Sequence, residues 1–193
     1  MKTQIFASAL LAAIAFAPVS AMAEEAHVAP VKDFVSSSVE GWLADPIVVD
    51  AINEQNAKTS GLDQAAIDQM DKDWRAQATA SDKPMVDEVL ARALSKFLME
   101  KKEGSEGMIT EMFVMDAKGL NVGQSDVTSD YWQGDEAKWQ KTYGVGAGEV
   151  FVDEVEEDES TQALQSQASV TISDPATGEP IGAITIGINL DML

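Results

Sequence analysis

The sequence predicts an α+β domain in which a long N-terminal helix and further helices pack on a five-stranded antiparallel sheet. Two observations lead to this prediction. In the first half of the chain, apolar residues recur at helical spacing, whereas from Ile109 onward they recur with a period of two. Turn-forming stretches rich in Gly, Asp and Pro separate the strand candidates. The predicted order is helices, a hairpin, a helical insertion and three strands, in one domain over residues 24–193.

Residues 1–23 are predicted to be a cleaved signal peptide. Lys2 supplies the positive start, residues 5–16 form an apolar run too short to cross a bilayer with ease, and Ala21 and Ala23 supply small residues before the cleavage point. We expect a periplasmic protein that does not span the membrane after cleavage. The alternative is an uncleaved membrane anchor, but no stop-transfer pattern follows.

Charge and composition exclude several classes of function. The net charge is −20 and the pI is about 4.1, so nucleic acid and anionic membranes would be repelled. The chain has no cysteine, and its single histidine, His27, lies near the predicted mature N-terminus. A thiolate nucleophile is therefore excluded, and a Ser-His-Asp triad or a histidine zinc site is disfavoured. We expect no enzyme activity, no metal and no cofactor, although a carboxylate-based hydrolase stays open.

Four helical elements are expected. The first covers residues 31–58 and restarts at Pro46, with Asp45 as its cap. The second follows a cap at Ser60, and the third begins at Pro84 and continues without a break to Lys101. The fourth is an insertion over residues 131–142.

Five strands are expected over residues 108–116, 120–125, 148–155, 162–173 and 181–190. In the fourth strand the buried face is predicted to carry Leu164, Ala168, Val170 and Ile172, and in the fifth Ile184, Ile186, Ile188 and Leu190. Gly182 and Gly187 thin the last strand, which permits a bend or the close approach of a helix. Met108 and Met112 share a strand face, and core filling is favoured for them and for Met115 over a soft-metal site.

Four stretches together resemble the extracytoplasmic Cache (PAS-like) sensor domains of bacterial receptors. They are "ADPIVVDAINEQNAKTSGL" (44–62), "IDQMDKDWRA" (67–76), "MFVMDAKGLNVGQSDVTSDYWQGDEAKW" (112–139) and "SDPATGEPIGAITIGINLDML" (173–193). The resemblance covers residues 31–193 and implies a single freestanding Cache domain. It implies a small pocket enclosed by the sheet and the segment that crosses it, with amino acids, short carboxylates or other small metabolites as ligands.

The chain also departs from the family pattern. We expect no output domain after Leu193. The arginine-rich signature of the amino-acid-binding relatives is missing, because the only arginines are Arg75 and Arg92. The identity of the ligand therefore does not carry over from the resemblance.

The candidate site centres on "TSDYWQGDEAKW" (128–139). On a helix, Trp132, Trp139 and Tyr143 fall at i, i+7 and i+11 and share one face, with Asp135 and Glu136 between them. These rings would line a pocket, and Asp135 or Lys138 would orient a polar ligand. The alternative is a short helix that its rings fasten to the sheet.

Three further residues and one acidic stretch are weighed as parts of a site. Tyr131 would offer its hydroxyl from another face of the helix, and Asp130 is favoured as the N-cap rather than as a ligand contact. Arg75 is a candidate partner for an anionic ligand, although a surface ion pair is favoured. The acidic stretch 153–160 is interpreted as a solvated turn rather than a calcium site.

The sequence thus predicts a periplasmic protein that binds a small polar metabolite, namely an amino acid, a carboxylate or an amine. It would present this ligand to a membrane receptor or to another exported protein. The alternative is a structural or interaction protein with the same fold and a filled core. A cavity bordered by Tyr131, Trp132 and Tyr143 would favour binding, and rings packed against one another would favour docking.

Overall fold

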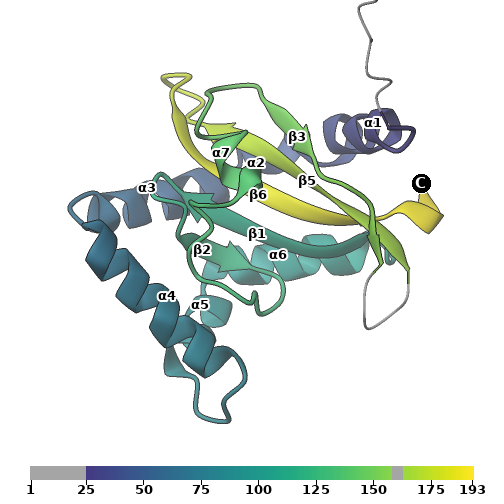
Figure 1. Ribbon diagram of the computed structural model, residues 1–193. Coiled ribbons are helices and arrows are strands. Elements are labelled where there is room, and N and C mark those ends of the chain that lie inside the picture. Colours follow the sequence, from purple (N-terminus) through teal and green to yellow (C-terminus); the bar gives the residue numbers. More distant parts are fainter. Residues whose placement is uncertain (1–24, 158–162) are drawn as a thin grey trace, which may run out of the picture.

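A computed structural model describes residues 25–157 and 163–193 of the chain, and the predicted signal peptide lies outside them. Helices pack on an antiparallel sheet that runs through the middle of the domain (Figure 1). The α+β prediction is confirmed, and over the described ranges the sheet has six strands in place of the expected five. Within the described residues, no helix combines the length and the apolar character needed to span a membrane.

The helices are α1 (Val28–Ser38), α2 (Glu40–Leu43), α3 (Pro46–Thr59), α4 (Gln64–Ala78), α5 (Pro84–Ala91), α6 (Ala93–Gly104), α7 (Ala137–Gln140) and the 3-10 helix η1 (Leu190–Met192). The strands are β1 (Ile109–Asp116), β2 (Asn121–Gln124), β3 (Val150–Val152), β4 (Glu156–Glu157), β5 (Leu164–Ser173) and β6 (Pro180–Asn189). The strand order is β2-β1-β6-β5-β3, and β4 pairs with β5. Every pair is antiparallel, as predicted.

Helix caps decide where the N-terminal helices begin. The Asp45 carboxylate accepts a hydrogen bond from the Ile47 backbone N–H at 3.0 Å, which confirms the predicted restart at Pro46. The Ser60 cap is wrong, because Ser60 still continues the last turn of α3. Asp63 caps α4 instead, accepting from the Ala66 N–H at 2.9 Å.

The predicted third helix is in fact two helices. Arg92 has extended backbone (φ −62°, ψ 152°) and separates α5 from α6. Ser95 compensates for the interruption, since its hydroxyl donates to the Val89 carbonyl at 2.7 Å and accepts from the Gln124 N–H at 3.0 Å. The apolar spacing continues across the break, so periodicity alone did not reveal it.

One face of the sheet forms the main core with α1, α3 and α6. It carries Met112 and Val114 of β1, Ala168, Val170 and Ile172 of β5, and Ile184, Ile186 and Ile188 of β6. Met108 also packs there, so the core role of these methionines is confirmed. Leu164 is 46% exposed, so its placement on a buried strand face was wrong. Leu190 packs against this core as predicted, but it belongs to η1 and not to the strand.

Gly182 lets α3 approach the sheet closely. A Cβ atom at this position would lie 2.2 Å from the Met115 carbonyl oxygen and 3.2 Å from Ile52 Cγ2 of α3. The close approach predicted for this strand is confirmed.

Residues 125–149, here called the crossover segment, connect β2 to β3 across the other face of the sheet. The predicted helix over residues 131–142 is wrong, because only α7 is helical. The chain around Trp132 instead pairs with the β1–β2 turn. The Asn121 N–H donates to the Tyr131 carbonyl at 2.9 Å, and the Gln133 N–H donates to the Gly119 carbonyl at 2.7 Å. Trp132 therefore does not share a helical face with Trp139 and Tyr143.

Candidate ligand-binding site

The candidate site lies on the sheet face beneath the crossover segment, here called the crossover face. Strand pairing places Phe113 opposite Thr185, Ser169 opposite Thr185, and Thr171 opposite Ala183. Residues directly opposite each other on neighbouring strands share a face. The same rule adds Met115 with Asn121 and Phe113 with Gln124 at the β2 edge.

Polar side chains on the crossover face are buried. Asn121, Gln124, Ser169 and Thr185 are all 0% exposed, and Thr171 is 6% exposed. The Ser169 and Thr185 hydroxyls are bonded to each other at 2.9 Å. This is an unusual use of interior space, because a polar group loses its hydration when it is buried and must recover it through a partner.

Several of these groups have no such partner. Among the described residues, buried side-chain atoms without a hydrogen bond include Oδ1 of Asn121, Nε2 of Gln124 and Oγ1 of Thr171. All three belong to the crossover face. One further atom of this kind, Oδ1 of Asp130, lies 2.8 Å from Nη1 of Arg75 in an ion pair. The unused hydrogen-bonding capacity is therefore concentrated beneath the crossover segment.

Trp139, Tyr143 and Lys138 cover this face from α7 and the residues after it. The Trp139 and Tyr143 rings lie 5.1 Å apart and pack against Phe113, Met115 and Ala183. Trp139 Nε1 donates to the Asp116 carbonyl at 3.2 Å, which holds the cover to the end of β1. Burial raises the pKa of the Tyr143 hydroxyl above its ordinary value, and the nearby Asp116 adds to this effect.

Lys138 brings charge to the site. Its ammonium lies 5.4 Å from the centroid of the Phe113 ring and 2.8 Å from the Glu136 carboxylate. The Lys138 side chain is only 15% exposed and that of Glu136 is 35% exposed. A cation and a carboxylate are therefore both available at the margin of the crossover face.

Tyr131 lies elsewhere, in a cluster between α4, α5 and the β1–β2 turn. Its ring stacks on Trp74 at 5.2 Å and is 3% exposed. Burial raises the pKa of the Tyr131 hydroxyl above its ordinary value, even though the neighbouring Arg92 acts in the opposite direction. Tyr131 therefore anchors the crossover segment to the helices.

Trp132 is also held by the β1–β2 turn. Its Nε1 donates to the Lys118 carbonyl at 2.8 Å. Trp132 and Trp139 both border an open groove of about 310 Å³ beside Ile67 and Lys118. The buried polar side chains of the crossover face do not line this groove.

Arg75 forms the surface ion pair that the sequence favoured. Its guanidinium lies 2.7 Å from Asp71 and 2.8 Å from Asp130. The hydrogen bond to Asp71 raises the pKa of Arg75 above its ordinary value, despite the opposing effect of burial. Asp71 also accepts from the Tyr131 and Trp132 N–H groups at 2.9 and 3.0 Å. Asp130 is therefore an ion-pair partner and not a helix cap.

Of the predicted site residues, the structure brings together Lys138, Trp139 and Tyr143. Tyr131, Trp132 and Arg75 lie in neighbouring clusters, and Asp135 is exposed. Their roles in ligand binding stay predictions. The acidic stretch 153–160 lies partly outside the described residues, and the part of the chain that is described contains no cluster of three or more metal-ligating side chains.

Ser169, Thr171 and Thr185 were not predicted from the sequence as site residues. The signal was present, because a period of two that places Ala168, Val170 and Ile172 in the core also places Ser169 and Thr171 together on the other face.

Comparison with known proteins found similarity at the level of structure. No family model matches the chain, and no curated protein matches it either. Among solved structures, it is similar to the sensor domain of the histidine kinase DctB from V. cholerae, with 14% identity and a TM-score of 0.48 over 85% of this chain and 50% of that one.

Two chemoreceptor domains are further structural neighbours. The ligand-binding domain of Campylobacter jejuni Tlp3 in complex with 4-methylisoleucine shows 11% identity and a TM-score of 0.38, over 81% of this chain and 60% of that one. The ligand-binding domain of Pseudomonas fluorescens CtaA in complex with L-serine shows 11% identity and a TM-score of 0.39, over 86% of this chain and 59% of that one.

These neighbours are sensor and ligand-binding domains. The chain spans about half to three fifths of the length of these three structures. What it binds must therefore be inferred from its own residues.

Proposed function

We propose that this protein is a periplasmic sensor-type protein that binds a small polar metabolite between the crossover face and the crossover segment. The observation that supports this most directly is the set of unpaired buried atoms on Asn121, Gln124 and Thr171. An unpaired buried polar group lowers the free energy of unfolding by roughly 1–3 kcal/mol, so three such groups on one face destabilise the protein substantially. Asn121 and Gln124 lie on β2, three strands away from Thr171 on β5, so a bound small ligand would supply the missing partners at one of these two positions.

The side chains at this face suit a ligand that carries both donors and acceptors. Hydroxyls can take either role, and the amides of Asn121 and Gln124 offer one orphan acceptor and one orphan donor. Lys138 and Glu136 add one charge of each sign at the margin. An amino acid fits this combination, and simple carboxylates and amines each use part of it.

A thermal-shift screen with amino acids, short carboxylates and amines tests the proposal. A ligand that binds only the folded state raises the melting temperature by mass action. Thr171→Val is the informative variant because it removes the orphan hydroxyl without changing the shape of the side chain. We expect the unliganded variant to be as stable as the wild type or more stable, while its response to the ligand falls.

Thr177→Val is the matched control, since Thr177 lies in the exposed β5–β6 turn. It should leave the ligand response unchanged. A Thr171→Val protein with an undiminished response would remove Thr171 from the site.

The packing of the rings favours a second candidate, an interaction protein with a filled interior. Trp139 packs on Tyr143, and Tyr131 packs on Trp74, as expected for docking rather than binding. Trp139→Ala distinguishes the two functions, because it uncovers the crossover face. Loss of the ligand response with the fold kept supports binding, whereas a screen without any stabilising compound supports the interaction protein. Trp132→Ala tests the predicted role of Trp132 at the outer groove in the same way.

We further propose that the protein reports or delivers its ligand to a membrane receptor or another exported protein after cleavage of residues 1–23. The amino-terminal features of the sequence support export. Periplasmic fractionation and N-terminal sequencing of the mature protein test this, with Glu24 expected as the first residue. Recovery of the protein in the cytoplasm with Met1 retained would contradict it.

A further inference from the structure

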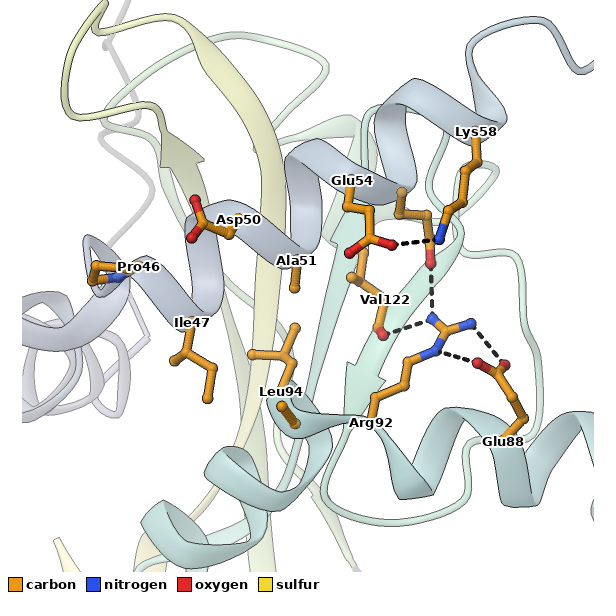
Figure 2. A pocket seen from close by; sticks show the side chains of 12 residues that line it. Pro46, Ile47, Asp50, Ala51, Glu54, Lys58, Glu88, Arg92, Leu94 and Val122 are labelled. Carbon is orange, nitrogen blue, oxygen red and sulfur yellow. Dashed lines mark hydrogen bonds and ion pairs between the residues drawn. The ribbon is translucent and has the colours of Figure 1, made fainter.

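A second groove, separate from the crossover face, lies between α3 and the junction of α5 with α6 (Figure 2). Its volume is about 470 Å³, which is within the range of small-molecule sites. Its walls come from three segments that are distant in sequence: α3, the α5–α6 junction and Val122 of β2.

The lining of this groove changes character along α3. Ile47, Ala51, Glu54 and Lys58 follow one another at i, i+4, i+7 and i+11, so they form one stripe on the helix. The first half of the stripe is apolar and faces Leu94 of α6, whereas the second half is charged and faces Arg92 and Glu88 (Figure 2). One end of the groove is thus apolar and the other polar.

Arg92 fixes the shape of the groove and is not free to bind a ligand. Its guanidinium bonds to both carboxylate oxygens of Glu88 at 3.1 and 2.8 Å, and Nη1 donates to Gln55 Oε1 at 2.9 Å and to the Val122 carbonyl at 2.8 Å. Although burial opposes its charge, the bond to Glu88 keeps the pKa of Arg92 above its ordinary value. The extended backbone at Arg92 turns α6 away from α5, which opens the slot.

The charges of the groove leave one carboxylate without a partner. Lys58 pairs with Glu54 at 2.7 Å, and Arg92 pairs with Glu88. Asp50 also lines the groove and forms no ion pair within the described parts of the chain. An anionic ligand would have to displace a glutamate from its cation, whereas a cationic ligand would leave both pairs intact. The net charge of −20 further enriches cations at the surface.

We propose that this groove binds a small organic cation, a protonated primary amine on an aliphatic or aromatic body. The apolar body lies against Ile47, Ala51 and Leu94, and the ammonium lies at the polar end beside the carboxylates of Glu54 and Glu88. Asp50, one helical turn before Glu54, adds negative charge at the rim of the groove. None of the residues that line the groove belongs to the crossover face, so this proposal is independent of the proposed function.

Isothermal titration calorimetry of the full chain with hexylammonium chloride tests this proposal, with hexanol and sodium hexanoate as probes of the same length. We expect hexylammonium to bind most tightly and hexanoate not to bind. Ala51→Leu should abolish binding because it fills the apolar end of the groove. Ala57→Leu, at an exposed position of the same helix, should leave binding unchanged.

Asp50→Asn tests the electrostatic part on its own. Because the group is exposed, we expect a loss of about threefold in affinity at low salt and a weaker dependence on salt. Asp33→Asn on α1 is the control and should have no effect. Equal binding of hexanol and hexylammonium would overturn the electrostatic argument. Binding that survives Ala51→Leu but is lost in Thr171→Val would place the amine at the crossover face and overturn the assignment to the groove.

Discussion

The two faces of the sheet are built from alternate residues of the same strands, yet their interiors differ. On the helix side, β6 presents Ile184, Ile186 and Ile188, all 0% exposed. On the crossover side, the same strand presents Ala183, Thr185 and Gly187, and β5 presents Ser169 and Thr171. Both faces are buried, but among the residues that the structure describes, the sheet's buried side-chain polar atoms without a hydrogen bond lie on the crossover face.

This difference indicates that the two faces have different roles, one in stability and one in presenting polar groups. Apolar burial on the helix side contributes stability in proportion to the area removed from water. Polar burial on the crossover side reduces stability unless each group is paired. The fold therefore has its stabilising core on one side, and this leaves the other side able to carry groups that are suited to a ligand.

The largest effect is expected from truncating the helix-side core. Ile186→Ala should destabilise the protein by about 2–5 kcal/mol, because it leaves a cavity at a fully buried position between the sheet and its helices. Urea denaturation measures the change in free energy of unfolding. A loss below that of the crossover-face variant Thr185→Val would contradict the division between the two faces.

How far the fold follows from local sequence depends on the element. The hairpin β1–β2 and the restart at Pro46 are local features, since alternation, a turn and an Asp45 cap suffice to specify them. The conformation of the crossover segment is not specified locally, because its residues pair with the distant β1–β2 turn. A Cβ atom at Gly134 would lie 2.4 Å from Trp132 Nε1 and 2.9 Å from the Lys118 carbonyl, so this glycine is required by a tertiary contact. Aromatic spacing suggested a helix, and tertiary pairing overrode it.

The next largest effect is expected at Asp116, which joins the two sides of the sheet. Its fully buried carboxylate accepts from Gln55 Nε2 at 3.1 Å, from Thr59 Oγ1 at 2.9 Å, and from two backbone N–H groups of the β1–β2 turn. Asp116→Asn replaces an acceptor with a donor among these donors. We expect a loss of about 2–4 kcal/mol in denaturant unfolding.

Asp174→Asn is the control for this variant. Asp174 also accepts from two backbone N–H groups, at 2.7 and 3.3 Å, but in the exposed β5–β6 turn. Its loss should stay below about 1 kcal/mol because water can replace the acceptor. Equal losses at Asp116 and Asp174 would show that burial of Asp116 adds nothing.

A smaller effect is expected on the crossover face itself. Thr185→Val breaks the 2.9 Å bond to the Ser169 hydroxyl and leaves that hydroxyl buried without a partner. The cost should be about 1–2 kcal/mol in denaturant unfolding. Adding Ser169→Ala should recover part of this loss, since both polar partners are then absent. A double variant less stable than Thr185→Val would indicate that packing, and not hydrogen bonding, governs this face.

The candidate site could be predicted from the sequence only in part. Lys138, Trp139 and Tyr143 were found because aromatic and charged residues are conspicuous near one another. Ser169, Thr171 and Thr185 are small polar residues that are usual in strands, and their significance appears only when the crossover segment buries them. Arg92 went unassigned because its partners lie on α3, α5 and β2.

The smallest effect concerns the two tyrosines of the crossover segment at alkaline pH. Burial raises the pKa of Tyr131 and of Tyr143 above the ordinary value of 10.0. A raised folded-state pKa means that the folded protein holds the phenolic proton more tightly than the unfolded chain does. The resulting contribution to the free energy of unfolding is present below about pH 10 and is lost as the pH rises through the folded-state pKa. Tyr131→Phe should therefore flatten the alkaline decline in unfolding free energy. Tyr143→Phe should flatten it less, because Tyr143 is half-buried whereas Tyr131 is 3% exposed. Lysine titration is common to all the variants, so the difference between their alkaline declines in unfolding free energy isolates the tyrosines.

An equal or larger flattening of that decline for Tyr143→Phe would mean that the cover of the crossover face excludes water better than the Trp74 cluster does. Such a result would strengthen the case for an enclosed site beneath the cover.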